Sequence, residues 1–312
     1  EIDKMGIRHI VHLGDCFDRR KYINFNTLSS CRNYFFDEIK KRDIELHMIV
    51  GNHDTFFKNT NDVNSPRLLL KDYEFNVIDT PSELEFDDGS KIFMMPWICT
   101  DNYNQSMEAI KTTDAQVLFG HFEIAGFQMY KGHENDEGFD PKIFEKFDTV
   151  CSGHFHHRSS NGNINYLGNP YEIFWNDVND TRGFHIFDTE TLEHTPVNNP
   201  YKMYYVIYYD DDNYQTFDTR EYENKIVKVI VRKKSNTKKF EKFIDKLYAS
   251  NISELKIVEN LQIEENEEFE AYESEDTLSI LNRYVEESEI SLDKSIVQKM
   301  LHEIYREACE IV

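Results

Sequence analysis

Four short loops of the chain are rich in side chains that bind metal ions, and each follows a short apolar run. These loops are GDCFD at 14–18, GNHD at 51–54, GH at 120–121 and GHFHH at 153–157. Asp, Asn and His offer oxygen and nitrogen ligands, which suit manganese or iron and tolerate zinc. One such loop is usually only a turn, but four of them in one chain predict a metal centre.

The ligand types indicate what such a centre does. Two divalent ions about 3.5–4 Å apart need a shared carboxylate that offsets their mutual repulsion. Neutral imidazole and amide ligands leave the ions enough positive charge to bind a phosphate group. The five cysteines are scattered and form no CxxC pair, which argues against a structural zinc site or a disulfide framework. We therefore expect a catalytic site for phosphate chemistry, in a reducing, cytoplasmic compartment.

The apolar runs before the loops predict the strands that position them. Residues 7–13, 46–50, 117–119 and 149–152 each end in one of the four loops, and 92–95 and 183–188 are further strands. Residues 26–41 have helical spacing. Continuous apolar strands alternating with helices predict an α/β layered sheet, with its site at the strand C-termini. We assign this domain to residues 1–190.

The pattern changes beyond residue 200. Strands at 201–209, 226–231 and 254–258 and a helix at 238–249 predict a small α+β unit over residues 200–260. Residues 225–246 contain nine Lys or Arg and two acids, which indicates either a solvated face or contact with a nucleic-acid backbone. Residues 261–276 read as an acidic linker, and 277–312 as a helix pair. A wide apolar stripe on the last helix favours docking on a partner over packing on its own domain.

The ordered set GDxxD, GNHD, GH and GHxH resembles the calcineurin-like metallophosphoesterases. It is most similar to the SbcD-type nuclease subunits of double-strand-break repair, and especially to those of T-even phages. The block Gly168-Asn169-Pro170 followed by NDTRGFHIFD at 179–188 strengthens this resemblance. It implies a layered α-β-β-α metallophosphoesterase sandwich with a small α+β capping domain and C-terminal helices.

The resemblance also implies roles for individual residues. Asp15 corresponds to the carboxylate that bridges two divalent ions, expected to be manganese, and Asn52, His121 and His154 correspond to further ligands of one ion. His156 corresponds to a ligand of the other ion. His53 matches the histidine that stabilises or protonates the leaving oxygen, and Asp18 matches the acid that orients it. Candidate substrate contacts are Arg19, His157, Lys228, Arg232, Lys233 and Lys234.

The first motif of that family, Asp-x-His on the first strand, has no counterpart here. The chain opens EIDKMGIRHIVHLGD, in which 1–5 read as the tail of a helix and Gly6 as its cap. We therefore expect a chain that begins inside an element and lacks its first strand. Its second metal site would be incomplete, and the chain by itself weakly active or inactive although its parent is active.

Three functions follow from these observations. The first is a divalent-metal-dependent DNA endo/exonuclease subunit that works with an SbcC-like ABC-type coiled-coil ATPase, as a homodimer within the complex. The second is a phosphomonoesterase or nucleotide phosphatase on the same fold, and the third is a non-catalytic scaffold for DNA or the ATPase. The net charge of −23 excludes broad DNA binding by charge alone, and no apolar run is long enough to span a membrane.

Overall fold

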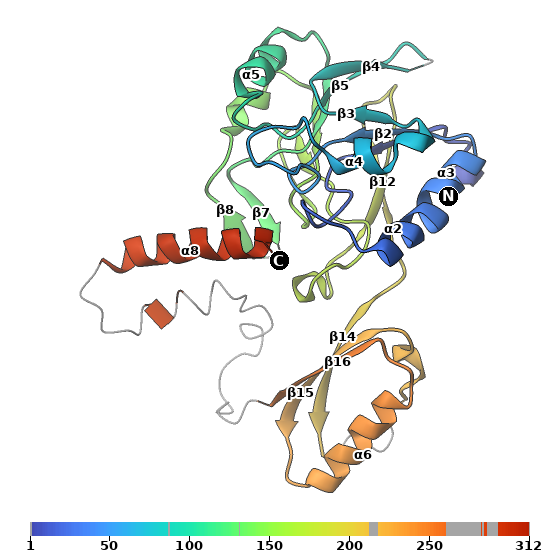
Figure 1. Ribbon diagram of the computed structural model, residues 1–312, viewed down its shortest axis with the longest axis vertical. Helices are drawn as coiled ribbons and strands as arrows, with labels where there is room; N and C mark the ends of the chain where they lie inside the picture. The colour runs from blue at the N-terminus through green and yellow to red at the C-terminus, as the bar shows by residue number, and fades with distance from the viewer. Residues whose placement is uncertain are drawn as a thin grey trace. The chain divides into compact units, whose positions relative to one another are not determined.

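The computed structural model describes residues 2–86, 88–130, 132–211, 218–259, 282, 284–285 and 293–311 (Figure 1). The chain divides into two compact units. The first contains residues 1–169, 184–197 and 303–312, and the second contains residues 170–183 and 198–302. The four ligand-rich loops all belong to the first unit.

Two sheets form the centre of the first unit. One is parallel and has the order β1 (His9–His12), β2 (Glu45–Ile49), β3 (Asn76–Ile78). The other has six strands in the order β10 (Ser159–Asn161), β11 (Ile164–Tyr166), β9 (Thr149–Ser152), β6 (Val117–Gly120), β5 (Lys91–Met95), β4 (Ser82–Glu85). Its four inner strands are parallel, and the edge strands β4 and β10 are antiparallel to their neighbours.

Three apolar clusters arrange this unit in layers. Ile49 and Ile78 of the first sheet pack with Met94 and Phe119 of the second, so the two sheets face each other. Helices α2 (Phe25–Cys31) and α3 (Asp37–Lys41) cover the outer face of the three-stranded sheet. Helix α5 (Tyr103–Thr112) contributes Ile110 to the cluster on the outer face of the six-stranded sheet. The layers run α-β-β-α, which confirms the expected fold class.

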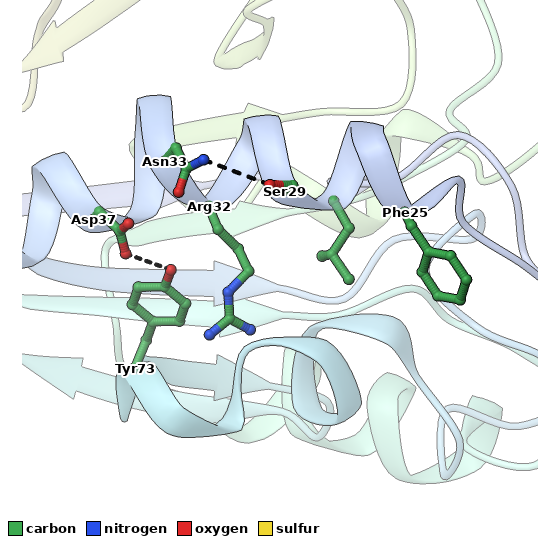
Figure 2. A pocket seen from close by; sticks show the side chains of 7 residues that line it. Phe25, Ser29, Arg32, Asn33, Asp37 and Tyr73 are labelled. Carbon is green, nitrogen blue, oxygen red and sulfur yellow. Dashed lines mark hydrogen bonds between the residues drawn. The ribbon is translucent and has the colours of Figure 1, made fainter.

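The helix predicted over 26–41 is interrupted. Asn24 caps α2 by accepting hydrogen bonds from the main chain, and a π-helical turn at Arg32–Phe36 separates α2 from α3. The turn directs Phe36 into the core, where it is 1% exposed. A cavity of about 340 Å³ lies beside this helical layer. Figure 2 shows that Arg32 projects into it next to Tyr73. No residue of the four loops lines that cavity.

Shorter elements complete the first unit. Helix α1 (Ile2–Met5) ends at Gly6, whose φ of 66° suits a glycine cap, as the sequence predicts. The others are α4 (Ser65–Leu69), β7 (Phe127–Tyr130), β8 (His133–Asn135), β12 (Gly183–Phe187) and β13 (His194–Asn198). Single 3-10 turns occupy Lys71–Tyr73 and Pro141–Phe144.

The second unit has a core of its own. Parallel strands β14 (Tyr204–Asp210), β15 (Ile226–Lys233) and β16 (Glu254–Glu259) form one sheet in that order. Helix α6 (Thr237–Tyr248) connects β15 to β16 and buries Phe240, Phe243 and Leu247 against the sheet. Further 3-10 turns lie at Trp175–Asp177 and Arg220–Tyr222. The strands and helix predicted in 200–260 are confirmed.

The C-terminal region is described in part. The acidic linker expected at 261–276 lies outside the described residues, as does most of the first helix expected after it. Of the last helix, α8 (Lys294–Ile311) is described. No helix among the described parts of the chain is both long enough and apolar enough to cross a membrane.

Candidate metal centre

The four ligand-rich loops meet where strands of both sheets end. Asp15 follows β1 and Asn52 follows β2, while His121 and His154 follow β6 and β9 of the other sheet. Close approach of the loops requires glycine at two points. A Cβ on Gly153 would lie 2.4 Å from the Leu13 carbonyl oxygen, and a Cβ on Gly51 would lie 2.2 Å from Asp15 Oδ1. The alternation of apolar strand and glycine-containing loop therefore builds the centre.

Four side chains converge at this junction. His121 Nε2 lies 3.1 Å from Asp15 Oδ2 and 3.0 Å from Asn52 Oδ1. His154 Nδ1 lies 3.0 Å from the same Asn52 oxygen. Among the described residues, Asp15, His121 and His154 form one of two groups whose ligand atoms all lie within 4.8 Å of one another. The structure thus brings together one carboxylate, one amide and two imidazoles from four separate loops.

The main chain fixes the orientation of His121. Its Nδ1 lies 2.7 Å from the Leu13 carbonyl oxygen, which can only accept, so Nδ1 carries a proton and donates it. In the neutral ring, Nε2 then presents a lone pair toward the Asp15 and Asn52 oxygens. Three acceptor atoms facing one another require a cation between them, either a proton or a metal ion. This donor set fits a divalent ion.

The charges of the cluster are strongly coupled. Burial alone would raise the pKa of Asp15, but the neighbouring imidazoles, His121 first, lower it well below its ordinary value. Burial would lower the pKa of His121, but the charge of Asp15, the hydrogen bonds to Asp15 and the Leu13 carbonyl, and the charge of Asp54 together raise it. Burial, followed by the charge of His121, lowers the pKa of His154 to about 3. Asp15 is therefore anionic and His154 neutral, the states in which both bind metals.

A buried carboxylate outside the cluster joins two of the loops. Asp54 is 1% exposed and accepts hydrogen bonds from the main-chain N–H groups of Asp15 at 2.8 Å, Cys16 at 3.0 Å and Gly51 at 2.9 Å. Burial, then the charge of Asp15, raises its pKa, and these hydrogen bonds oppose that rise. Asp54 thereby holds the β1 loop and the β2 loop together.

His53 is positioned beside the cluster by two hydrogen bonds. Its main-chain N–H donates to Asp15 Oδ1 at 2.8 Å, and its ring Nδ1 lies 2.6 Å from the main-chain carbonyl oxygen of Asp18. The contact from Asp18 therefore comes from the carbonyl group, whereas the sequence pattern suggested the carboxyl group. With Nδ1 donating to the Asp18 carbonyl, Nε2 is the ring nitrogen that can exchange a proton with a substrate.

The remaining candidates near the loops lie around this cluster. His156 is half-buried and close enough to His154 for its charge to lower the pKa of that residue, but it is not in the group of ligand atoms within 4.8 Å. Arg19 is exposed, and its guanidinium lies 5.0 Å from the centre of the Tyr22 ring. His157 is half-buried, and its main-chain N–H donates to the Met129 carbonyl oxygen at 3.3 Å.

The basic candidates of the second unit lie on or just after β15. Lys228 is half-buried with its Nζ 4.1 Å from the centre of the Trp175 ring, and burial, then Lys256, lowers its pKa to about 8. Arg232 stacks 3.9 Å from the centre of the Tyr208 ring. Lys234 pairs with Glu259 at 2.7 Å. Lys233 is exposed.

Sequence reasoning missed three contributors to the centre. The Leu13 carbonyl acts through the main chain, which no side-chain pattern reveals. The Trp97 ring lies 5.3 Å from that of His154 and 6.0 Å from that of His121, and forms an apolar wall. Tyr166 holds the loop after His121, since its hydroxyl contacts the main chain of Phe122 and Ile124. A signal for Trp97 was present in its position two residues after the predicted strand at 92–95.

The fold and this ligand set match a known family. The chain belongs to the calcineurin-like phosphoesterases, whose family model matches residues 2–158. It is 35% identical over 271 residues to exonuclease subunit 1 of Enterobacteria phage T4, a match that covers 86% of this chain and 78% of that protein. It is 26% identical over 183 residues to the SbcD subunit of the SbcCD nuclease of Staphylococcus epidermidis, covering 47% of this chain and 46% of that protein.

These findings identify the chain as a metallophosphoesterase, and therefore as a hydrolase. Members of the family use divalent metals, and the convergence of Asp15, Asn52, His121 and His154 provides ligands for one. Both relatives are subunits of nucleases by name. The resemblance stated from the loop motifs is confirmed.

Proposed function

We propose that this chain is the nuclease subunit of a DNA repair or recombination complex that hydrolyses phosphodiester bonds in DNA with divalent metal ions. The convergence of Asp15, Asn52, His121 and His154 in a metallophosphoesterase fold carries the proposal. The names of the phage and staphylococcal relatives favour a nucleic-acid substrate over a phosphomonoester. Those names, with the scattered cysteines, also support a cytoplasmic setting.

The metal ligands are assigned as follows in this proposal. Asp15, Asn52, His121 and His154 would hold one of two ions, with Asp15 shared between them, and His156 would be a ligand of the other. Mixed oxygen and nitrogen ligands without thiolate favour manganese. When bound, such ions supply Lewis-acid polarisation of the phosphate and activation of a water for attack.

His53 is the residue that we propose to handle the proton of the leaving oxygen. The hydrogen bond from its main chain to Asp15 fixes it beside the metal ligands, and its Nδ1 contact with the Asp18 carbonyl orients the ring. A protonated His53 donates from Nε2 to the oxygen on which negative charge develops as the phosphorus–oxygen bond breaks. Asp18 acts as a positioning residue through its main chain.

Contacts with the DNA backbone are proposed for Arg19, His157, Lys228, Arg232, Lys233 and Lys234. Arg19 and Lys233 are exposed, which suits direct contact with phosphate. Lys234 is already paired with Glu259, so its binding to phosphate competes with that ion pair. Broad attraction of DNA is excluded by a net charge of −23, so we propose that binding also depends on an SbcC-like coiled-coil ATPase and on a homodimer of this chain.

A comparison of substrates tests this function. The purified chain is incubated with Mn²⁺ under enzyme excess, in parallel with a DNA hairpin, a DNA 3′ end and p-nitrophenyl phosphate. Enzyme excess is needed because the described residues supply few ligands for a second ion, so rates will be low. We expect Mn²⁺-dependent cleavage of DNA that exceeds monoester hydrolysis. Hydrolysis of the monoester alone would establish a phosphatase, and Mn²⁺-independent DNA binding without cleavage would establish a scaffold.

A further inference from the structure

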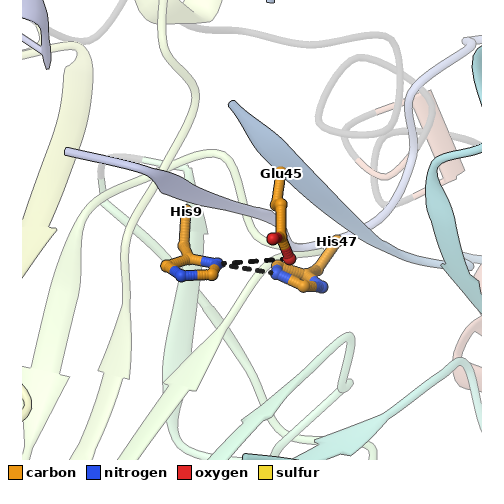
Figure 3. Close-up of side chains that lie close together, drawn as sticks. All are labelled: His9, Glu45 and His47. Atoms are coloured by element: carbon orange, nitrogen blue, oxygen red, sulfur yellow. Dashed lines mark hydrogen bonds and ion pairs between the residues drawn. The ribbon is translucent and has the colours of Figure 1, made fainter. Parts of the chain in front are cut away.

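A second group of ligand atoms lies far from the catalytic cluster. His9 is the first residue of β1, and Glu45 and His47 belong to the neighbouring strand β2. His9 and Glu45 are direct partners in the parallel register, and residues two apart on a strand point to the same face. The three side chains therefore share one face at the start of these strands (Figure 3). Asp15 follows the other end of β1, which runs from His9 to His12.

The spacing of these atoms matches a metal site. His9 Nδ1 lies 3.3 Å from His47 Nε2 and 3.7 Å from Glu45 Oε2. Ligand atoms of a tetrahedral zinc ion with bonds of about 2.0–2.1 Å are about 3.3–3.4 Å apart. The two nitrogens already have that separation. Glu45 is exposed, and a small rotation of its side chain would bring Oε2 from 3.7 Å to the same distance from His9 Nδ1.

The surroundings favour a neutral His47 imidazole in a fixed orientation. His47 is 3% exposed, and burial, then the charge of His9, lowers its pKa to about 4. The Phe86 ring packs edge-on against both imidazoles, with ring centres 5.0 Å from His9 and 6.0 Å from His47. A neutral His47 and two rings held in place by packing lose little conformational freedom when they bind a metal.

Asn76 on β3 supplies the partner that a metal-binding histidine requires. Its side-chain amide lies 3.1 Å from His47 Nδ1. For Nε2 to bind a metal, Nδ1 must carry the proton and donate it, so the amide must present its oxygen. Asn76 is exposed, and rotation of its amide by a half turn achieves this.

We propose that His9, Glu45 and His47 form a zinc site distinct from the catalytic centre, with two imidazoles, one carboxylate and a water as ligands. Such a ligand set suits Zn²⁺ better than the oxygen-preferring Mg²⁺ or Ca²⁺. The ion would tie the start of β1 to the start of β2, at the end of the sheet opposite the catalytic loops. Its role would be to stabilise the three-stranded sheet.

Zinc binding to the full chain, measured by chelator competition and by Co²⁺ absorption, tests the site. His9→Gln and Glu45→Gln are chosen because both positions are partly or fully exposed. We expect His9→Gln to weaken Zn²⁺ binding at one site about 100-fold and Glu45→Gln to weaken it about 10-fold. Asn76→Asp should tighten it, because a carboxylate accepts the His47 Nδ1 proton more strongly.

A second histidine pair gives the matched control. His185 and His194 face each other across β12 and β13 with their Nδ1 atoms 2.8 Å apart, and no third ligand is grouped with them among the described residues. His194→Gln should leave zinc binding unchanged. Because zinc can also enter the Asp15 cluster, every variant is repeated with His154→Gln. Equal zinc affinity in the parent, His9→Gln and Glu45→Gln chains, with unchanged circular dichroism, would overturn the proposal.

Discussion

The convergence of acceptor atoms is the main feature at the scale of single residues. His121 Nε2 lies 3.1 Å from Asp15 Oδ2 and 3.0 Å from Asn52 Oδ1. The Leu13 carbonyl keeps the ring proton of neutral His121 on Nδ1. A proton shared with Asp15 satisfies this arrangement in the absence of metal. Binding of a divalent ion must therefore release that proton, so metal affinity rises with pH.

Asp54 gives a prediction at this scale. Replacement of Asp54 by Asn removes acceptor capacity from a side chain that binds main-chain N–H groups of both ligand loops. We expect the free energy of unfolding to fall by about 1–3 kcal/mol and metal-dependent cleavage to fall roughly 10- to 100-fold. Urea denaturation and DNA cleavage assays measure the two effects. Asp62→Asn, at an exposed position nearby in the sequence, should change neither.

Residue types and their order along the chain could be predicted from sequence, but main-chain partners could not. The GNHD and GHFHH loops identified Asn52, His53 and His154 because amide and imidazole groups are unusual at strand ends. The carbonyl groups of Leu13 and Asp18 orient His121 and His53, and any residue type could supply a carbonyl. The part of the site built from the backbone therefore became visible only in the structure.

At the scale of elements, the site depends on how closely strand ends approach. Gly51 follows β2, and a Cβ there would lie 2.2 Å from Asp15 Oδ1 and 2.5 Å from the Asp15 main-chain nitrogen. Real Cβ atoms essentially never lie within 3.0 Å of another heavy atom, so both Asp15 atoms would have to move. Because these atoms belong to Asp15, an expected metal ligand, their displacement would disturb the metal-binding cluster.

We predict that Gly51→Ala lowers metal-dependent cleavage at least about 100-fold, since a shift of about 1 Å in a catalytic group is enough for such a loss. The matched control is Gly162→Ala. Gly162 has a φ of 59°, but nothing lies within 4 Å of an added Cβ, so this change strains the backbone without touching the site. Comparable losses in both variants would show that general destabilisation, and not the approach to Asp15, causes the effect.

Two histidines of the strands predict how stability depends on pH. Burial, as the largest cause in each case, lowers the pKa of His12 on β1 and of His47 on β2 from 6.5 to about 4. Between these values the unfolded chain takes up protons that the folded chain does not. The free energy of unfolding therefore falls as pH drops from 6.5 toward 4, by at most about 1.4 kcal/mol per pH unit for each histidine.

Urea denaturation at about pH 7, 6 and 5 with a chelator present measures this dependence. The His47→Gln variant should show a shallower fall in stability with acid than the parent chain, because one of the histidines with a lowered pKa no longer titrates. Equal slopes in the two chains would contradict the assignment of a neutral, buried His47.

The strands that end in ligand loops were predictable, because continuous apolar runs closed by glycine-containing loops are typical of buried parallel strands. The observed β1, β2, β6 and β9 lie within or beside the predicted runs. Helix α5 was not predicted, because its sequence YNQSMEAIKT buries only Ser106 and Ile110. The π-helical turn at Arg32–Phe36 was also missed, since it depends on the tertiary burial of Phe36.

At the scale of the whole molecule, charge is distributed unevenly. Residues 261–312 contain fifteen acids and four bases, whereas 225–246 contain nine bases and two acids. Several of those bases are already engaged, as Lys234 is with Glu259 and Arg232 is with the Tyr208 ring. The large net negative charge of the chain opposes the approach of DNA.

We predict weak DNA binding by the isolated chain with a steep dependence on salt. If about four basic side chains contact phosphate, affinity should fall about 100-fold between roughly 50 and 200 mM salt. Lys233→Ala should reduce the slope of log affinity against log salt by about 1, because Lys233 is exposed. Fluorescence anisotropy with labelled DNA measures both, and Lys71→Ala, an exposed lysine of the first unit, serves as the control. A salt-independent affinity would contradict phosphate contact.

The four loops are proposed to form one divalent-metal centre that cleaves DNA. The decisive experiment is Mn²⁺-dependent cleavage of a DNA hairpin by the parent chain and by His154→Gln, measured under enzyme excess. The variant removes one imidazole whose partner in the cluster is Asn52, and His194→Gln controls for the loss of a histidine elsewhere. We expect cleavage to fall at least about 100-fold in His154→Gln and to be unchanged in His194→Gln. Equal cleavage by the parent chain and His154→Gln would show that the activity does not arise at this centre.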